Sequence, residues 1–170
     1  MNCIYRYATP PQFDDLWMSS DGEYLTALWF NGSEDDKKHR VGCTEVKSYF
    51  SLPSVLKETC SWLDIYFSGI EPSFTPKFKI EGITPFREEV QQILLAIPFG
   101  QTVSYGEIAV QIAKRHGIKK MSAQAVGNAV GWNPICIIIP CHRVIGTDGS
   151  LTGYGGGINN KNLLLTLEKK

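Results

Sequence analysis

The chain has no excess of charge of either sign. Its 17 basic and 17 acidic residues cancel to a formal net charge of zero. The molecule as a whole therefore has no general attraction to nucleic acid or to an anionic membrane surface. Any nucleic-acid-binding surface must be a local patch of basic residues.

Cysteine is sparse and irregularly spaced. The five cysteines are Cys3, Cys43, Cys60, Cys136 and Cys141. An odd number without regular spacing argues against a disulfide framework. No two of them form a Cys-x-x-Cys pair, so the standard zinc-binding spacings are absent. Two interpretations stay open for the N-terminal thiols: isolated cysteines of the core or surface, or a metal site in which Cys3 and Cys43 meet His39 after folding.

Long hydrophobic runs are also missing. No apolar stretch is long enough to cross a bilayer, and the start, MNCIYRYATPPQ, lacks the charged-then-apolar pattern of a signal peptide. We therefore expect a protein of the reducing cytoplasm, or of the nucleus in a eukaryote, without membrane association. Hydrophobic residues still make up 43% of the 170 residues, which is enough for the core of one domain or two small ones.

Three segments near the N-terminus are predicted strands. They are rich in aromatic and branched residues and end at Gly, Asn or Ser. The segments are residues 4–8, 15–20 and 23–32. Asp21-Gly22 lies between the second and the third and favours a hairpin turn. The first part of the chain is thus predicted to contain a small β-sheet.

The chain from residue 33 to residue 82 is predicted to hold one long helix. Residues 33–40 form a charge-dense stretch that we expect to be a loop. Residues 54–69 have apolar side chains at helical spacing, with Ser54 as the expected N-cap and Gly69 as the stop. Residues 71–82 contain two prolines and no helical period; they are expected to be a linker that can include a short strand.

The second part of the chain is predicted to be mostly helical. Thr84-Pro85 begins one helix, and the sequence SYGE at 104–107 is a capping box that begins another, which runs to Gly117. A third helix, residues 122–131, follows a short basic turn and has mainly small side chains. Two helices joined by a short turn form a helix-turn-helix pattern. A helix without bulk can lie against DNA, or it can pack tightly on another helix.

Cysteine and histidine are adjacent in IIIPCHRVIG. Residues 135–139 are apolar and bracketed by prolines, which predicts a buried strand that ends at Cys141. A free thiol has a pKa near ~8.5, so an imidazole could activate it. Neighbours on an extended chain point to opposite sides, so His142 would need a bend or a bridging water, and an acid to fix its tautomer. The alternative is a buried cysteine beside a structural histidine.

From about residue 84 to residue 168 the sequence resembles the O6-alkylguanine-DNA alkyltransferases (methylated-DNA–protein-cysteine methyltransferases). The motifs that carry the resemblance are TPFREEV, IPFGQTVSYGEIA, AVGNA, NPICIIIPCHRVIG and LTGYGGGINNKNLLLTLE. It implies an α+β fold: a small N-terminal β-sheet domain of ribonuclease-H-like shape (residues 1–80, with the linker), then a winged-helix domain with a helix-turn-helix (residues 81–170). The first eighty residues match the family only in pattern.

The resemblance also implies catalytic roles. Cys141 aligns with the cysteine that accepts the alkyl group, His142 with its water-linked base, and Glu168 with the acid that orients the base. Asn133 aligns with the residue that braces the active-site turn, and Tyr105 with the one that crowds the target phosphate. The alkylguanine pocket would be formed by Val130, Val144, Tyr154 and Gly155. The reaction needs no metal and no organic cofactor.

In the family the helix at 122–131 reads the minor groove, which suits its small side chains. The expected DNA contacts are Ser122, Ala123, Gln124 and Gly127 of that helix, together with Thr102, Ser104, Tyr105 and Arg143. Two positions depart from the family pattern. Gln124 stands where an arginine usually enters the base stack, and glutamine brings neither the charge nor the broad stacking plane. Trp132 stands where small or polar residues are common.

The implied function is DNA repair. The protein, expected to be a monomer, would bind duplex DNA that contains O6-alkylguanine, flip the base out, and transfer the alkyl group irreversibly to Cys141 in a single turnover. O4-alkylthymine is a possible second substrate. Two alternative functions stay open. One is a lesion-binding protein without transfer activity; the presence of Cys141 argues against it, whereas Gln124 is consistent with it. The other is a transcription regulator that uses alkylation as its signal.

Overall fold

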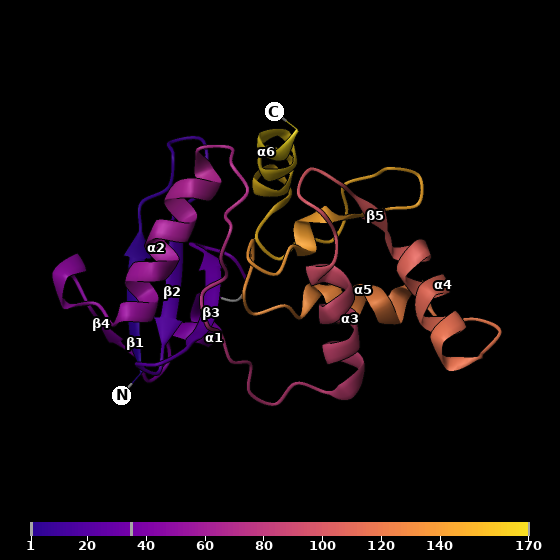
Figure 1. Cartoon of the computed structure of the whole chain (residues 1–170), viewed down its shortest axis with the longest axis horizontal. Helices are drawn as coiled ribbons and strands as arrows, with labels where there is room; N and C mark the ends of the chain where they lie inside the picture. Colours follow the sequence, from indigo (N-terminus) through magenta and orange to yellow (C-terminus); the bar gives the residue numbers. More distant parts are fainter. Residues whose placement is uncertain (1, 35, 170) are drawn as a thin grey trace.

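The computed structural model describes residues 2–34 and 36–169. A four-stranded sheet forms one side of the molecule (Figure 1), with the strand order β3-β2-β1-β4. The strands are β1 (Cys3–Tyr7), β2 (Leu16–Ser20), β3 (Leu25–Phe30) and β4 (Thr44–Glu45). The first three are antiparallel neighbours, and β4 runs parallel to β1. The three predicted strands and the sheet are therefore present, with one short strand added.

The turn between β2 and β3 follows from its sequence. The Asp21 carboxylate accepts hydrogen bonds from the backbone N–H groups of Glu23 and Tyr24, and Gly22 adopts a positive φ of 110°. A short polar side chain that binds backbone two and three residues ahead is the usual way in which Asp closes a tight turn.

The charged stretch 33–40 is not simply a loop, because it contains the short helix α1 (Asp36–Arg40). Tertiary contacts hold α1 on the sheet. Asp36 accepts a hydrogen bond from the indole N–H of Trp29, and the Arg40 guanidinium lies 4.0 Å from the ring centre of Trp17. Local charge patterning does not reveal such contacts, so the prediction of a loop was wrong here.

Helix α2 (Ser54–Phe67) packs against β2 and β3, on one face of the sheet. Its predicted N-cap was one residue off. Pro53 occupies the N-cap position without a side-chain hydrogen bond, and Ser54 is the first helical residue. A short 3₁₀ turn, Tyr49–Ser51, precedes the helix. Within the linker, Phe78 forms a single bridge to Leu25 at the start of β3.

The rest of the chain is mostly helical. It contains α3 (Pro85–Leu95), α4 (Tyr105–His116), α5 (Ala123–Gly131) and α6 (Ile158–Glu168), with the two-stranded parallel pair β5 (Val103–Ser104) and β6 (Val144–Ile145). The side chains of Thr84, Ser104 and Ser122 cap α3, α4 and α5, and the capping box at Ser104 and Glu107 is complete. Local sequence was sufficient to locate these three helix starts.

The buried segment 135–139 is not a strand. Only Ile135 forms a bridge, to Leu28 of β3, and residues 136–138 form a turn in which Ile137 has a φ of 65°. A positive φ is strained for a β-branched residue, and packing holds it, since Ile137 is 1% exposed. The prediction of burial was right, and the prediction of extended backbone was wrong.

One apolar core joins both parts of the chain. It includes Leu28 and Phe30 of the sheet, Leu63 of α2, and Val90 and Ile108 of the helical part. No helix in the described part of the chain combines the length and apolar character needed to span a membrane.

The metal interpretation of the N-terminal cysteines has no support in the described residues, which contain no group of three His, Cys, Asp or Glu side chains placed to hold an ion. The Cys43 thiol instead lies 3.6 Å from the backbone carbonyl of His39.

Candidate active site

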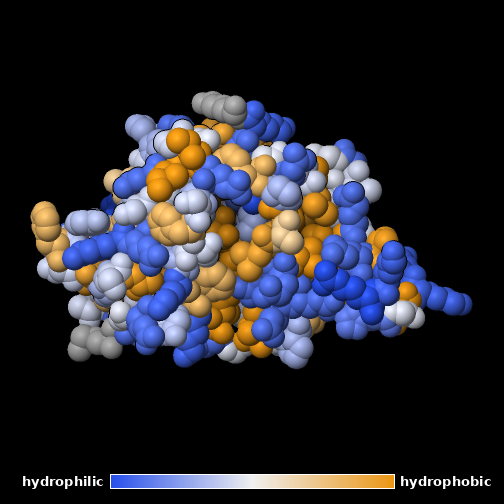
Figure 2. Space-filling model, in the orientation of Figure 1, coloured by the Kyte–Doolittle hydropathy of each residue, from blue (hydrophilic) through white to orange (hydrophobic). Residues whose placement is uncertain are grey.

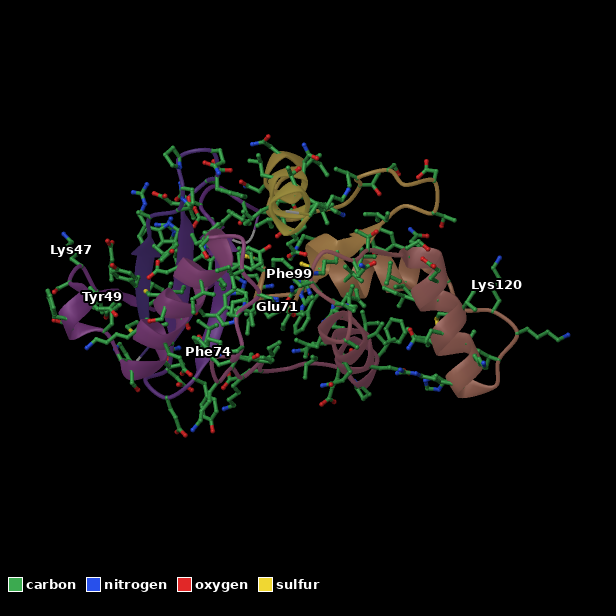
Figure 3. All side chains as sticks on the ribbon, turned by 45° about the horizontal axis from the view of Figure 1, so that its top comes forward. Lys47, Tyr49, Glu71, Phe74, Phe99 and Lys120 are labelled. Carbon is green, nitrogen blue, oxygen red and sulfur yellow. The ribbon has the colours of Figure 1, made fainter. Side chains whose placement is uncertain are left out.

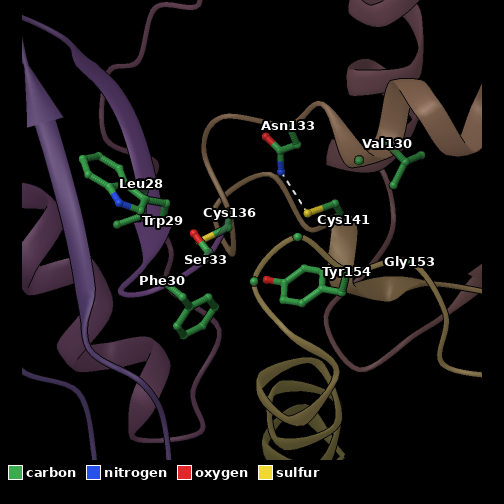
Figure 4. Close-up of a pocket in the computed structure, with 13 residues that line it drawn as sticks. Leu28, Trp29, Phe30, Ser33, Val130, Asn133, Cys136, Cys141, Gly153 and Tyr154 are labelled. Atoms are coloured by element: carbon green, nitrogen blue, oxygen red, sulfur yellow. Dashed lines mark hydrogen bonds between the residues drawn. The ribbon is translucent and has the colours of Figure 1, made fainter. Parts of the chain in front are cut away.

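The Cys141 thiol is held by the side chain of Asn133 (Figure 4). The Asn133 amide nitrogen, Nδ2, lies 3.0 Å from Sγ of Cys141 and also donates to the carbonyl of Ile139 at 2.8 Å. Its oxygen, Oδ1, accepts from the N–H of Ile135 at 3.0 Å. One side chain therefore closes the turn before Cys141 and presents a donor to the sulfur.

The sheet braces the same turn from the other side. The N–H of Leu28 donates to the carbonyl of Pro134, and the N–H of Cys136 donates to the carbonyl of Leu28, both at 2.9 Å. These bonds satisfy backbone groups that an extended strand would have paired. They show how β3 and Asn133 together fix the position at which the short 3₁₀ turn Cys141–Arg143 begins.

The environment of the thiol contains opposing influences. Cys141 is 7% exposed, and burial raises its pKa above the ordinary value of a cysteine. The Asn133 hydrogen bond and the nearby Lys161 ammonium favour the thiolate and limit the rise. At neutral pH the sulfur is therefore mostly a thiol, and a base must remove its proton.

His142 and Glu168 form a buried pair next to the thiol. Nε2 of His142 lies 2.6 Å from Oε1 of Glu168, and the His142 side chain has no exposed surface. Burial lowers the pKa of His142 below its usual value despite the carboxylate, so the imidazole is neutral. A carboxylate against Nε2 places the ring proton on that nitrogen. The lone pair is then on Nδ1, which is buried and has no hydrogen-bond partner among the described residues.

Glu168 has three further partners that the sequence did not reveal: Tyr66, Gly100 and Arg143. The hydroxyl of Tyr66, on α2, donates to Oε1 at 2.7 Å. The backbone N–H of Gly100 donates to Oε2 at 3.0 Å. Burial raises the pKa of Glu168, but the hydrogen bonds from His142 and Arg143 and the positive charge of Arg143 outweigh it and hold the pKa far below the usual range. The carboxylate is thus charged at all ordinary pH values.

Arg143 lies inside the molecule, on Glu168, and not at the surface. It was expected to contact DNA, but it is 8% exposed, and its guanidinium lies inside the molecule. Nε donates to Oε2 of Glu168 at 2.8 Å, and another nitrogen donates to the carbonyl of Ile97 at 2.7 Å. A buried carboxylate needs a cation or several donors, and Arg143 supplies both.

Lys161, on α6, is a second buried cation that the sequence reading missed. Its ammonium donates to the carbonyls of Val144 at 2.6 Å and Thr152 at 3.1 Å, and burial lowers its pKa. Lysine is rarely fully buried without such partners. These contacts tie α6 to the two ends of the loop that precedes the Gly-rich segment.

A small cavity of about 20 Å³ adjoins Cys141. Three of the predicted pocket residues line it: Val130, Tyr154 and Gly155. Val144 does not, because it is fully buried in β6. The opposite wall comes from the sheet, through Leu28, Trp29, Phe30 and Ser33, and the thiol of Cys136 is also in the lining (Figure 4). The contribution of β3 could not be read from the sequence, because it depends on how the two parts of the chain pack.

Comparison with known proteins places this site in a family. The family model for the DNA-binding domain of 6-O-methylguanine DNA methyltransferase matches residues 85–170. The chain belongs to this family. A methylated-DNA–protein-cysteine methyltransferase of Methanosarcina barkeri is 49% identical over 162 residues, which cover 91% of this chain and 96% of that protein.

Two comparisons with proteins of Mycobacterium tuberculosis agree. A methylated-DNA–protein-cysteine methyltransferase of that organism is 50% identical over 117 residues, 69% of this chain and 67% of the relative. The crystal structure of its OGT in complex with DNA superposes with a TM-score of 0.77 at 38% identity, over 98% of this chain and 92% of the other. The mixed α+β architecture of a small sheet and helices is thus the one that solved members of the family have.

Tyr105, the first residue of α4, packs against α5 in this member of the methyltransferase family. Its ring packs 3.8 Å from the Cβ position of Gly127, and its hydroxyl donates to the carbonyl of Thr152 at 3.3 Å. Burial, and then the nearby Cys141, raises the pKa of the phenol. Tyr105 is not among the residues that line the cavity.

The other residues expected to bind DNA fall into two groups. Ala123 and Gln124 are exposed on α5, Gly127 is half-buried, and Thr102 is exposed just before β5. Ser122 is exposed, and its hydroxyl caps α5. Ser104 is a second correction: it is 8% exposed, and its hydroxyl bonds Glu107 in the capping box, which leaves it a structural role.

A basic patch adjoins α5 despite the zero net charge of the chain. Residues 108–147 contain no Asp or Glu, a signal that could have been read from the sequence. Lys114, Lys119 and Lys120 are all exposed in this stretch, and Lys120 extends away from the turn between α4 and α5 (Figure 3). The protein thus has the local patch that nucleic-acid binding requires.

Proposed function

We propose that this protein is a methylated-DNA–protein-cysteine S-methyltransferase that repairs DNA by moving an alkyl group from O6 of guanine to its own Cys141. The observation that carries the proposal is the hydrogen bond from Asn133 to the sulfur. This bond holds the thiol at the edge of a cavity, and the next residue, His142, has a neutral imidazole. The chain that carries this arrangement belongs to the 6-O-methylguanine DNA methyltransferase family.

The proposed activation is a proton relay. The Glu168 carboxylate accepts the Nε2 proton of His142 in a hydrogen bond with an N–O distance of 2.6 Å. The basic nitrogen of His142 is therefore Nδ1. A bridging water would carry the thiol proton to Nδ1. His142 is a suitable base because burial keeps it neutral. Asn133 and Lys161 then stabilise the thiolate as it forms.

The transfer itself is a single displacement. The Cys141 thiolate attacks the alkyl carbon, an S–C bond forms, and the C–O6 bond breaks with its electron pair left on guanine. Guanine takes up the proton that left the thiol, and the Tyr105 phenol, which its raised pKa keeps protonated, can donate a hydrogen bond to the departing oxygen. The product is a thioether. Attack on it by Cys136, which lines the same cavity, would only exchange one thioether for another, so the protein acts once.

The finer assignments form part of the same proposal. The exposed face of α5 enters the minor groove of duplex DNA, and Gln124 fills the gap that the flipped base leaves in the stack. The alkylated base rotates to the cavity beside Cys141, which widens from about 20 Å³ to hold it. The protein acts as a monomer. Residues 1–80 form a ribonuclease-H-like domain and residues 81–170 a winged-helix domain. The arrangement of α4 and α5 beside the β5–β6 pair supports the winged-helix assignment.

A single-turnover reaction tests the proposal. The protein is mixed with a duplex that contains one O6-methylguanine, and its intact mass is measured. We expect one added methyl group on wild type, mapped to the peptide of Cys141, and none on Cys141→Ser, because a hydroxyl is a far weaker nucleophile at neutral pH. Cys141→Ser should still bind the duplex. Methylation of Cys136 in place of Cys141 would contradict the assignment, and binding without any transfer by wild type would favour a lesion reader.

A further inference from the structure

Trp132 and Arg87 form a stacked pair at the C-terminal end of α5. The guanidinium carbon of Arg87, in the first turn of α3, lies 4.3 Å from the ring centre of Trp132. Trp132 is the C-cap residue of α5. An arginine stacked in this way is held flat while its edge N–H groups stay free to donate.

The Arg87 guanidinium has no hydrogen bond and no ion pair within the described part of the chain, whereas other arginines there are paired. Arg143 binds Glu168, Arg40 binds Asp36, and Arg115 lies 3.7 Å from Glu89. Arg87 is half-buried, and its stacking on Trp132 holds the guanidinium in place. Because no acceptor in the described part of the chain pairs with it, its N–H groups can donate to an acceptor from outside the molecule. An exposed side chain without a role would not need the tryptophan platform.

Arg87 and Trp132 both line a groove of about 740 Å³. The groove continues from the mouth of the active-site cavity, because the two share Gly131 and residues 153–156. Gly127 and Asn128 of α5 form its floor beside Trp132. The groove therefore connects the face of α5 that carries Gln124 with the thiol.

Charge is distributed unevenly around this groove. Asp14 and Glu34 line the opposite rim, beside the sheet, and Asp14 accepts a hydrogen bond from Asn160 at 2.8 Å. A polyanion is repelled by that rim and attracted to the side of Arg87. Figure 2 shows hydrophilic residues gathered at the far end of the molecule, around α4 and the turn that follows it.

The two ends of α5 thus both carry cations. Lys119 and Lys120 precede its N-terminus, and Arg87 lies at its C-terminus. The nine residues of α5 span about 13 Å at 1.5 Å per residue. A DNA backbone that follows this helix can therefore be held before and after the position of Gln124.

We infer that Arg87, held in place by Trp132, binds a backbone phosphate of the DNA at the C-terminal end of α5. The inference rests on the proposed function, because it assumes that α5 faces DNA. The chemistry is an arginine–phosphate hydrogen bond, charge-assisted and directional. It would offset part of the attraction that Gln124, being neutral, does not supply.

Binding to an undamaged duplex as a function of salt tests this inference. Each neutralised phosphate adds about 0.9 to the slope of log affinity against log salt for duplex DNA. We expect Arg87→Gln to weaken binding at low salt and to reduce that slope by about one unit. Trp132→Phe should weaken binding and keep the slope, because the cation remains but its platform is smaller. Arg87→Lys should likewise keep the slope.

Lys47→Gln is the matched control. It removes one exposed cation at the end of the molecule opposite to Lys120 (Figure 3), and its slope should equal that of wild type. If Arg87→Gln has the affinity and slope of Lys47→Gln, the inference is wrong. Because undamaged DNA is used, the outcome does not depend on alkyl transfer. The proposed function is refuted by a different result, namely that wild type takes up no methyl group from O6-methylguanine.

Discussion

At the scale of single residues, Asn133 does more than the sequence suggested. Its amide donates to the sulfur of Cys141 and to the carbonyl of Ile139, and its oxygen accepts from Ile135. The first bond favours the thiolate, and the other two hold a turn that contains a residue with positive φ. The same side chain therefore affects both the reactivity of the thiol and its position.

Asn133→Ala separates this side chain from the rest of the site. Loss of the donor removes one of the influences that lower the pKa of Cys141, so burial is less opposed and the thiol pKa should rise. We expect slower alkylation of Cys141 by iodoacetamide at pH 7 and a pH–rate curve moved to higher pH. Cys136→Ser is the control for the second thiol of the cavity. An unchanged pH–rate curve in Asn133→Ala would show that the amide does not stabilise the thiolate.

Glu168 links chemistry and stability. Glu168→Gln removes the charge that orients His142 and leaves Arg143 buried beside an amide. We expect alkyl transfer to slow by about 100-fold, the lower end of what a positioned base contributes, and stability to fall by about 3–5 kcal/mol, the usual cost of breaking a buried ion pair. Tyr66→Phe keeps both charges and removes one donor to Glu168, so it should fold and slow transfer less. The relay is wrong if the rate–pH curves of all three proteins coincide.

Acid should destabilise the wild-type protein through the same pair. The folded-state pKa of Glu168 lies below its ordinary value of 4.5, so the carboxylate contributes stability above about pH 4.5 that is lost as the pH falls. The folded-state pKa of His142 lies below 6.5, so its neutral burial also stabilises above that pH and costs stability below it. Urea unfolding between about pH 4.5 and pH 2 should show a smaller loss in Glu168→Gln than in wild type, because the amide of that variant takes up no proton on unfolding.

At the scale of elements, α5 combines an exposed face of small residues with one longer side chain, Gln124. Exposed Ala123 and half-buried Gly127 allow close approach to a narrow groove, and the Tyr105 ring packs behind Gly127. The two ends of the helix have the cations described above. The helix itself is therefore neutral between cations at its two ends, and Gln124 lies in its first turn.

Substitution of Gln124 tests this arrangement. Gln124→Arg adds a cation and a broader stacking plane, so it should bind duplex DNA more tightly at low salt, steepen the salt dependence by up to about one unit, and raise the rate of transfer from duplex. Gln124→Ala should lower that rate. The measurement is the ratio of the rate with O6-methylguanine duplex to the rate with free O6-benzylguanine, which needs no base flipping. Equal ratios in all three proteins would exclude Gln124 as the inserted residue.

At the scale of the whole molecule, the sheet and the helical part share the active site. Phe30 at the end of β3 meets Tyr154, with ring centres 6.4 Å apart, and both line the cavity. Gly156 passes so close to them that an added Cβ would lie 2.6 Å from each ring. The N-terminal sheet is thus a wall of the site as well as a neighbour of it.

Gly156→Ala should therefore destabilise the protein by about 1–3 kcal/mol, the usual cost of overpacking a core. Phe30→Leu in the same chain should recover part of that loss, because it removes one of the two crowded rings. Urea unfolding measures both. Gly131→Ala is a matched control, since an added Cβ there meets no atom within 4 Å and should be neutral or slightly stabilising in a helix. If the two glycine substitutions have equal effects, the close contact does not constrain the loop.

Features that depend on neighbours along the chain could be predicted from the sequence. The caps at Thr84, Ser104 and Ser122 and the turn at Asp21 involve residues two to three positions apart, so their chemistry is visible in the sequence. The motif around Cys141 was specific enough to indicate the family, which the comparisons confirm. The burial of residues 135–139 also followed from composition.

The contacts between groups far apart in the sequence could not be predicted, because they depend on how the chain folds. Arg143 was expected at the DNA and lies on Glu168 instead, because a buried carboxylate recruits the nearest cation whatever its place in the sequence. Residues 135–139 form a turn because Leu28 and Asn133 satisfy their backbone, and no local pattern encodes either partner. Tyr66 reaches the site for the same reason. Burial makes each polar group depend on a partner that only the folded chain can bring within hydrogen-bonding distance.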